Sequence, residues 1–271
     1  MTLHVTEYRQ GFGPGLTRVT RYEDPAEPTG IGFEVLTLKK AQVWRERTAV
    51  ETAFLLMSGK LRLTVGNRSE TFSRASLFDE SPSCLHVPAG TEVTIEADTP
   101  AELTLYRAPN AKTFDPRFYL SADTADEQRG KGQVGGACLR LVRTIFDGTN
   151  SDSRAELVLG EVVTLPGRWS SYPPHHHAQP EIYHYRFTHP QGFGHAELGD
   201  QVLKVRQYDT VKILDGNDHP QCAAPGYAMY YAWAIRHLPG NPYTVPEFTA
   251  EHRWTMEKDA VVWHPKAVAD D

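Results

Sequence analysis

Short runs of apolar or alternating residues recur along almost the whole chain, and turn-forming residues separate them. Residues 53–57 and 61–65 flank Ser58-Gly59-Lys60, and later runs are followed by Pro88-Ala89-Gly90 and Pro225-Gly226. Such runs are typical of β-strands, and the 3.6-residue periodicity of amphipathic helices is weak throughout. The pattern predicts an all-β chain with a strand–turn–strand unit centred on Gly59, and its spacing suits a sandwich or barrel.

The composition of the chain limits which binding partners and which cellular compartment are expected. The net charge of −6 includes no block of like charges, which argues against nucleic acid, and no apolar run approaches the ~20 residues of a transmembrane helix. The start of the chain lacks a signal-peptide pattern, and Cys84, Cys138 and Cys222 are few, scattered and odd in number. We therefore expect a cytoplasmic protein that acts on a small molecule, away from membranes; a homo-oligomer remains open.

The 271 residues are enough for two β domains, and the two halves resemble each other faintly. A glutamate precedes an apolar strand in each half, at Glu51 and Glu181. Residues 108–136 are rich in Pro, Asp, Lys and Gly and only weakly periodic, which is typical of a connection. We expect an N-terminal sandwich over residues 1–108, a connection over 109–136 and a C-terminal sandwich over 137–271.

The second half holds a cluster of metal-binding residue types. On an extended segment His175 and His177 project from one face while His176 points away. Glu181 begins the next apolar run and can return to that face after the turn at Gln179-Pro180. Two imidazoles and one carboxylate suit Zn, Fe, Mn, Ni or Co, and the set is too rich in nitrogen for Mg or Ca. The alternative is a solvated polyhistidine turn.

The spacing His-x-His-x3-Glu is similar to that of metal-binding cupins, whose sandwiches are double-stranded β-helices, or jelly rolls. The cupin pattern requires a fourth ligand, and His219 in a polar turn is the candidate; a surface histidine is the alternative. No such histidine pair precedes Glu51, and Val93 stands where a cupin would often place its last histidine. We therefore expect a bicupin of two jelly-roll sandwiches, with one divalent transition metal in the C-terminal half and none in the N-terminal half.

Aromatic and basic residues alternate after Glu181. By the two-residue period of a strand, Tyr183 and Tyr185 share the face of Glu181, while His184 and Arg186 take the opposite face. A tyrosine beside a metal can position substrate or carry a proton, and the alternative for these rings is core packing.

Several stretches together resemble the 5-deoxy-glucuronate isomerase family, the bicupin enzymes of bacterial myo-inositol breakdown. They are Gly160-Glu161-Val162, Gly167 to His177, Glu181 to Phe187, Gly192-Phe193-Gly194 and His219-Pro220. The chain departs from the family near the substrate site. Pro180 replaces the first of two paired glutamates, and His195-Ala196-Glu197 stands where the family has Gln-Arg.

The resemblance implies a metal-dependent aldose–ketose isomerase that converts 5-deoxy-D-glucuronate to 2-deoxy-5-keto-D-gluconate, or acts on a closely related sugar acid. The metal would hold the carbonyl and the neighbouring hydroxyl oxygen. Tyr183 or a metal-bound water is the candidate proton carrier. Arg186 or Arg206 is the candidate partner of the substrate carboxylate, if parity or a bend turns it inward. Two alternatives are a cupin dioxygenase with a three-His-one-Glu iron site and a metal-binding sugar-acid sensor without turnover.

Overall fold

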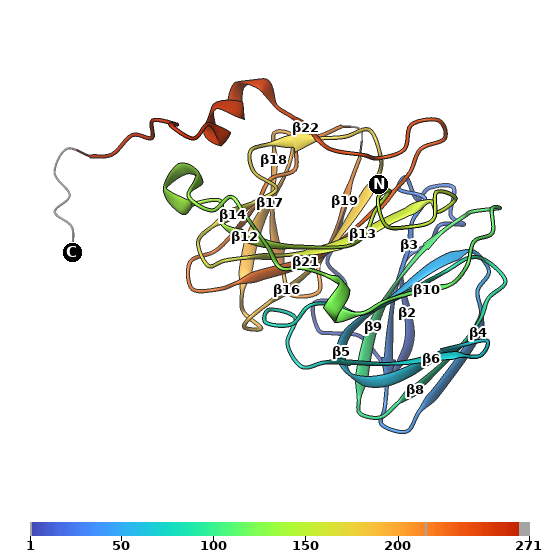
Figure 1. Cartoon of the computed structure of the whole chain (residues 1–271). Coiled ribbons are helices and arrows are strands. Elements are labelled where there is room, and N and C mark those ends of the chain that lie inside the picture. The colour runs from blue at the N-terminus through green and yellow to red at the C-terminus, as the bar shows by residue number, and fades with distance from the viewer. Residues whose placement is uncertain (1, 215, 266–271) are drawn as a thin grey trace.

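Two β-sandwiches pack face to face in the part of the chain that the structure describes, residues 2–214 and 216–265 (Figure 1). In this computed structural model the blue-to-green N-terminal sandwich lies against the yellow-to-orange C-terminal sandwich. The regular elements are strands and three short 3-10 helices, η1 (Ser121–Asp123), η2 (Gln133–Gly136) and η3 (Ala250–Met256). The all-β prediction is confirmed. None of the described helices is long and apolar enough to cross a membrane.

The N-terminal sandwich is a nine-stranded sheet folded over its own apolar core. Strand β5 pairs with β7 and β9 along its first half and with β6 and β8 along its second, so it belongs to both layers. The strands are β2 (Gly15–Thr20), β3 (Gly32–Leu38), β4 (Val43–Arg47), β5 (Glu51–Val65), β6 (Arg68–Arg74), β7 (Cys84–Val87), β8 (Glu92–Ala97), β9 (Ala101–Ala108) and β10 (Arg117–Tyr119).

Gly59 lies inside β5, so the prediction of a turn there is wrong. The strand continues through this position with a register shift against β9 between Leu56 and Ser58. Gly59 has φ +97°, and a Cβ on it would lie 2.3 Å from the carbonyl oxygen of Pro100. Glycine is needed for this conformation and close approach. The residue typical of a turn therefore allows one long strand to pass between the two layers.

The C-terminal sandwich has a seven-stranded inner sheet and a four-stranded outer sheet, with a two-stranded ribbon beside them. The inner strands, in spatial order, are β1 (His4–Val5), β19 (Thr210–Ile213), β16 (Glu181–Phe187), β21 (Met229–Arg236), β13 (Leu157–Thr164), β12 (Arg140–Phe146) and β11 (Glu127–Arg129). The outer strands are β14 (Trp169–Ser170), β20 (Gln221–Ala223), β17 (Phe193–Leu198) and β18 (Gln201–Arg206), and the ribbon is β15 (His175–His176) with β22 (Glu247–Phe248).

The boundaries between the two sandwiches differ from the expected ones, both before and after the N-terminal sandwich in the sequence. Strand β1 pairs with β19, so the first residues of the chain complete the C-terminal inner sheet. The expected connection contains β10, which pairs with β7 of the N-terminal sandwich, and β11, which pairs with β12 of the C-terminal one. These short strands lack the long alternating runs on which the sequence-based division depended.

An apolar core shared by both sandwiches holds them together. Alternate residues of β5, such as Ala53, Leu55 and Met57, pack in the same cluster as Leu159 of β13 and Ile182 of β16. The intervening residues of β5 face the core of their own sandwich. Strands with both faces buried explain why these runs are almost continuously apolar.

Candidate metal centre

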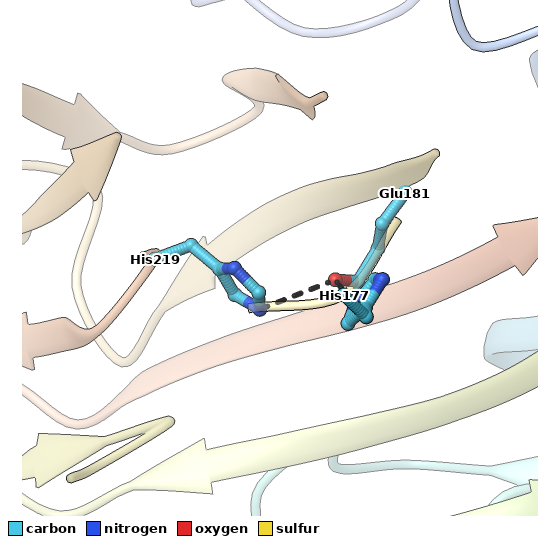
Figure 2. Close-up of side chains that lie close together, drawn as sticks. All are labelled: His177, Glu181 and His219. Carbon is cyan, nitrogen blue, oxygen red and sulfur yellow. Dashed lines mark hydrogen bonds and ion pairs between the residues drawn. The ribbon is translucent and has the colours of Figure 1, made fainter. Parts of the chain in front are cut away.

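Three of the predicted ligands meet at one end of the C-terminal sandwich. Glu181 opens β16, His177 follows β15, and His219 precedes β20. One potential ligand atom from each of these three residues lies within 4.8 Å of the other two, and Figure 2 shows their side chains converging. The Oε2 atom of Glu181 is 3.2 Å from Nε2 of His177 and 3.5 Å from Nε2 of His219.

Backbone carbonyls fix the tautomers of these histidines. Nδ1 of His177 lies 2.9 Å from the carbonyl oxygen of Gln179, and Nδ1 of His219 lies 2.9 Å from that of Asn217. A carbonyl oxygen only accepts hydrogen bonds, so Nδ1 carries a proton in both rings and Nε2 is the nitrogen that faces the other two residues. Metal-binding histidines are oriented by such a bond from the second ring nitrogen.

The arrangement fits a cation. The Nε2 atoms of two imidazoles and a carboxylate oxygen face one another in a buried space. Among the described residues the buried Nε2 of His219 has no hydrogen-bond partner. Burial lowers the pKa of His219 to about 4, although the Glu181 carboxylate opposes the shift, so this ring is neutral at neutral pH. A divalent transition metal would satisfy all three groups at once.

His175 lies beside the three converging residues rather than among them. Its ring centroid is 4.8 Å from that of His219, and its Nδ1 is 3.2 Å from the carbonyl oxygen of Pro173. Burial lowers the pKa of His175 to about 4, which again favours the neutral ring. It lines the same pocket as the other three side chains, so its role as a fourth ligand stays a proposal.

His176 points elsewhere, as the two-residue period predicts. Its Nδ1 is 2.9 Å from Oδ1 of Asp218, and it borders a neighbouring surface pocket instead. Thr249 donates a second hydrogen bond to the same carboxylate, at 2.7 Å. His176 therefore helps to hold in place the segment that carries His219.

Aromatic side chains form the walls of the pocket. Tyr183 is buried and stacks on Tyr231 with ring centroids 4.5 Å apart. Its hydroxyl oxygen lies 3.2 Å from Oγ of Ser171. Burial raises the pKa of Tyr183 well above its usual value, so the phenol keeps its proton. Trp233 forms another wall of the pocket. Its indole packs directly over Gly160, where a Cβ would lie 2.2 Å from the ring, so only glycine leaves room for it.

Arg186 is not part of this pocket, which corrects the expectation that it binds the substrate. The alternation predicted for β16 is observed: Tyr183 and Tyr185 face the core of the C-terminal sandwich, while Arg186 faces the N-terminal one. Its guanidinium donates to Oε1 of Glu102 at 2.6 Å and also contacts His184. A buried cation with a carboxylate partner of its own is structural. Arg206, the other candidate, does not line the pocket either.

Two other arginines do line the pocket, and the sequence interpretation missed both. Arg140 is the first residue of β12, and Arg129 is the last residue of β11. Arg140 shares the strand face of Val142, which belongs to the C-terminal core. The alternation along β12 could therefore have indicated that Arg140 faces the pocket. Arg129 gave no such indication, because the sequence does not predict β11 as a strand.

Glu51 has a different orientation from Glu181 despite its similar place at the start of a strand. His86 of the same sandwich approaches it at 2.8 Å, and Asn110, which follows β9, donates to it at 2.6 Å. The amides of Glu156 and Leu157 donate to the same carboxylate at 2.9 and 3.0 Å. Through the bonds from Glu156 and Leu157, the Glu51 carboxylate connects the two sandwiches. The expectation of no metal in the N-terminal half stays a prediction.

Solved structures with the same architecture support the fold. An IolB-like protein from Salmonella typhimurium superposes with a TM-score of 0.79 at 23% identity, covering 95% of this chain and 100% of that one. A mutant oxalate decarboxylase from Bacillus subtilis gives 0.62 at 12% identity, covering 91% and 79%. A cupin 2 conserved barrel domain protein from Leptotrichia buccalis also matches, with a TM-score of 0.52 at 13% identity, covering 86% and 95%. The predicted bicupin fold is confirmed.

Sequence relatives extend over most of the chain. A protein of Geobacillus kaustophilus named 5-deoxy-glucuronate isomerase is 29% identical over 84% of this chain and 86% of its own length. A protein of the same name from Listeria monocytogenes is 27% identical over 92% and 96%. The model of the KduI/IolB family matches residues 8–255. The chain therefore belongs to the KduI/IolB family.

Proposed function

We propose that this protein is a metal-dependent aldose–ketose isomerase that converts 5-deoxy-D-glucuronate to 2-deoxy-5-keto-D-gluconate. The observation that carries the proposal is the convergence of His177, Glu181 and His219, with His175 beside them, in a pocket of a chain of this family. The relatives of the same length that are named for this reaction support the substrate.

The resident metal is proposed to be one of Zn, Mn, Fe, Ni or Co, held by His175, His177, Glu181 and His219. When bound, such an ion polarises a substrate carbonyl as a Lewis acid. The reaction moves one hydrogen from the C2 carbon to the C1 carbon and one from the C2 hydroxyl to the C1 oxygen, so no oxidant or reductant is consumed. The donor set therefore serves as well with a redox-inert ion as with a redox-active one.

Tyr183 is proposed to handle the oxygen-bound proton. Its phenol is protonated at neutral pH and its hydroxyl is within 3.2 Å of Ser171, which itself lies 3.1 Å from the hydroxyl of Tyr231. A protonated phenol donates a hydrogen bond to an oxygen that gains negative charge. The three hydroxyl groups form a short relay at the pocket wall.

An anaerobic assay on 5-deoxy-D-glucuronate tests the function, with apo, Zn-loaded and Mn-loaded protein compared side by side. We expect conversion without oxygen, none in the apo protein, and recovery when a divalent ion is returned. A failure of all three forms to convert this sugar acid would refute the proposed substrate. Strict dependence on oxygen with another substrate would replace the isomerase by a dioxygenase, and tight binding without turnover would indicate a sensor.

A further inference from the structure

The pocket that holds the metal-binding residues also contains two positive charges on neighbouring strands. Arg129 of β11 and Arg140 of β12 are directly paired in the antiparallel register, so their side chains leave the sheet on the same face. Both line the pocket together with His175, His177 and Glu181. Like charges directly opposite each other on a sheet destabilise it unless a negative charge compensates them.

Arg140 has no carboxylate partner among the described residues. The one side-chain hydrogen bond of Arg140 in that part of the chain runs from Nη1 to the carbonyl oxygen of Cys138, at 3.0 Å. Burial lowers the pKa of Arg140, and the charge of Arg129 acts in the same direction. A guanidinium carries five donors, so Arg140 retains most of its hydrogen-bonding capacity. The fully buried arginines of the described residues differ: Arg74, Arg107, Arg143 and Arg186 each pair with a glutamate.

The surroundings keep this guanidinium near the pocket. Val142, two residues further along the same strand face, is fixed in the C-terminal core. Gly130 leaves room for the Arg140 side chain, since a Cβ at position 130 would lie 2.7 Å from Nη1. Arg140 and His175 line the same pocket. Arg129 is more exposed and pairs with Glu127 at 2.8 Å.

We propose that Arg140 is the anchor for the carboxylate of the sugar acid and that Arg129 assists it from the rim of the pocket. This inference rests on the proposed function for the identity of the sugar acid. An open-chain uronate carries its carboxylate at the opposite end from its carbonyl. Binding the carboxylate at Arg140 would therefore direct the carbonyl end toward His177, Glu181 and His219. Bidentate recognition of a carboxylate is the task for which a guanidinium is suited and an ammonium is not.

Binding and turnover measured separately keep the two proposals distinguishable. Metal-loaded wild-type protein, Arg140→Gln and Arg140→Lys are titrated calorimetrically with 5-deoxy-glucuronate and with 5-deoxy-glucose, which carries CH2OH in place of the carboxylate. We expect Arg140→Gln to bind the acid about 10- to 100-fold more weakly, to bind the neutral sugar unchanged, and to raise KM more than it lowers kcat. Arg140→Lys should recover only part of the loss.

Arg62→Gln, on an exposed position of β5 in the other sandwich, is the matched control and should bind both sugars as the wild type does. Circular dichroism and metal content confirm that each variant is folded and loaded. If wild-type protein binds the acid in an Arg140-dependent manner but does not convert it, the anchor stands and the isomerase assignment fails. Equal affinity of Arg140→Gln and wild type for the acid would overturn the anchor whatever the turnover. So would a wild-type protein that binds the acid no better than the neutral sugar.

Discussion

Arg74 of the N-terminal sandwich donates to Glu161 of the C-terminal sandwich through both of its terminal nitrogens, with Nη1 3.0 Å from Oε2. Glu161 also accepts hydrogen bonds from Arg143 at 2.9 Å and from the hydroxyl of Tyr230 at 2.8 Å. Arg74, Arg143, Glu161 and Tyr230 are all buried. The Glu161 carboxylate thus lies between two guanidiniums, and Arg143 also pairs with the carboxylate of Asp126.

Removing the Glu161 charge should destabilise the whole protein. Glu161→Gln leaves Arg74 and Arg143 buried without their shared counter-ion, and breaking a buried ion pair in this way costs about 3–5 kcal/mol. Urea unfolding followed by circular dichroism measures the loss. Glu92→Gln, at an exposed position of β8, should change the free energy of unfolding by less than about 0.5 kcal/mol. Equal stability of the two variants would show that the Glu161 network contributes little.

Metal should bind through His177 and stabilise the folded chain. In the wild type, free metal at 100 times its Kd adds about 2.7 kcal/mol, which corresponds to about 5–10 °C in Tm. His177→Ala should lose this shift and all turnover while keeping its fold, because the cores consist of apolar side chains from other strands. His176→Gln should retain the metal-dependent shift, since His176 contacts Asp218 instead. A metal-induced shift of wild-type size in His177→Ala would contradict the ligand assignment.

Loss of the Tyr183 hydroxyl should slow catalysis more than it weakens binding. We expect Tyr183→Phe to lower kcat about 100-fold at unchanged metal content, because a hydrogen-bond donor to the developing charge is removed. Tyr185→Phe is the matched variant on the same strand face. Its hydroxyl bonds Gln221 at 2.7 Å, outside the pocket, so its loss should cost about 1 kcal/mol of stability and leave kcat near that of the wild type. Steady-state kinetics on both variants decide whether the two hydroxyls differ in role.

Docking of the sandwiches through Glu51 should depend on pH. Burial alone would raise the pKa of Glu51, but the hydrogen bonds and charge from His86, Asn110 and the Glu156 amide outweigh it and lower the pKa. The ionised form then contributes stability that is fully present above the unfolded-state value of about 4.3 and is lost as pH falls through the folded-state pKa. The difference in unfolding free energy between wild type and Glu51→Gln should therefore shrink as the pH is lowered below about 4. A difference independent of pH would contradict this linkage.

The predictable parts of the structure are those that depend on local spacing. The two-residue period of a strand correctly separated Tyr183 from Arg186, and the His-x-His spacing led to His177 and Glu181. The turn predicted at Gly59 is wrong because glycine is favoured both in tight turns and where two backbone segments approach closely. Only the position of Pro100, next to Gly59 in the folded chain, shows that the second reason applies here.

The parts that escaped prediction are contacts between distant segments. Arg129 and Arg140 become neighbours through the pairing of β11 with β12, and nothing in the three residues of β11 distinguishes them from a loop. Glu161 was identified within a family-like stretch, yet its partner Arg74 lies 87 residues away, on the other sandwich. Such pairs depend on how the two sandwiches dock, which local periodicity does not specify.

The pairing of β1 with β19 has a consequence for the order in which the protein can fold during synthesis. His4 and Asp209 are 205 residues apart and lie 2.7 Å from each other, and Arg9 bonds the same carboxylate. Strand β1 is therefore synthesised about 200 residues before its partner strand β19. The N-terminal sandwich can form early, but the C-terminal sheet closes only after β19 has been synthesised, so a bulky domain inserted directly before β1 would affect a late folding step rather than an early one.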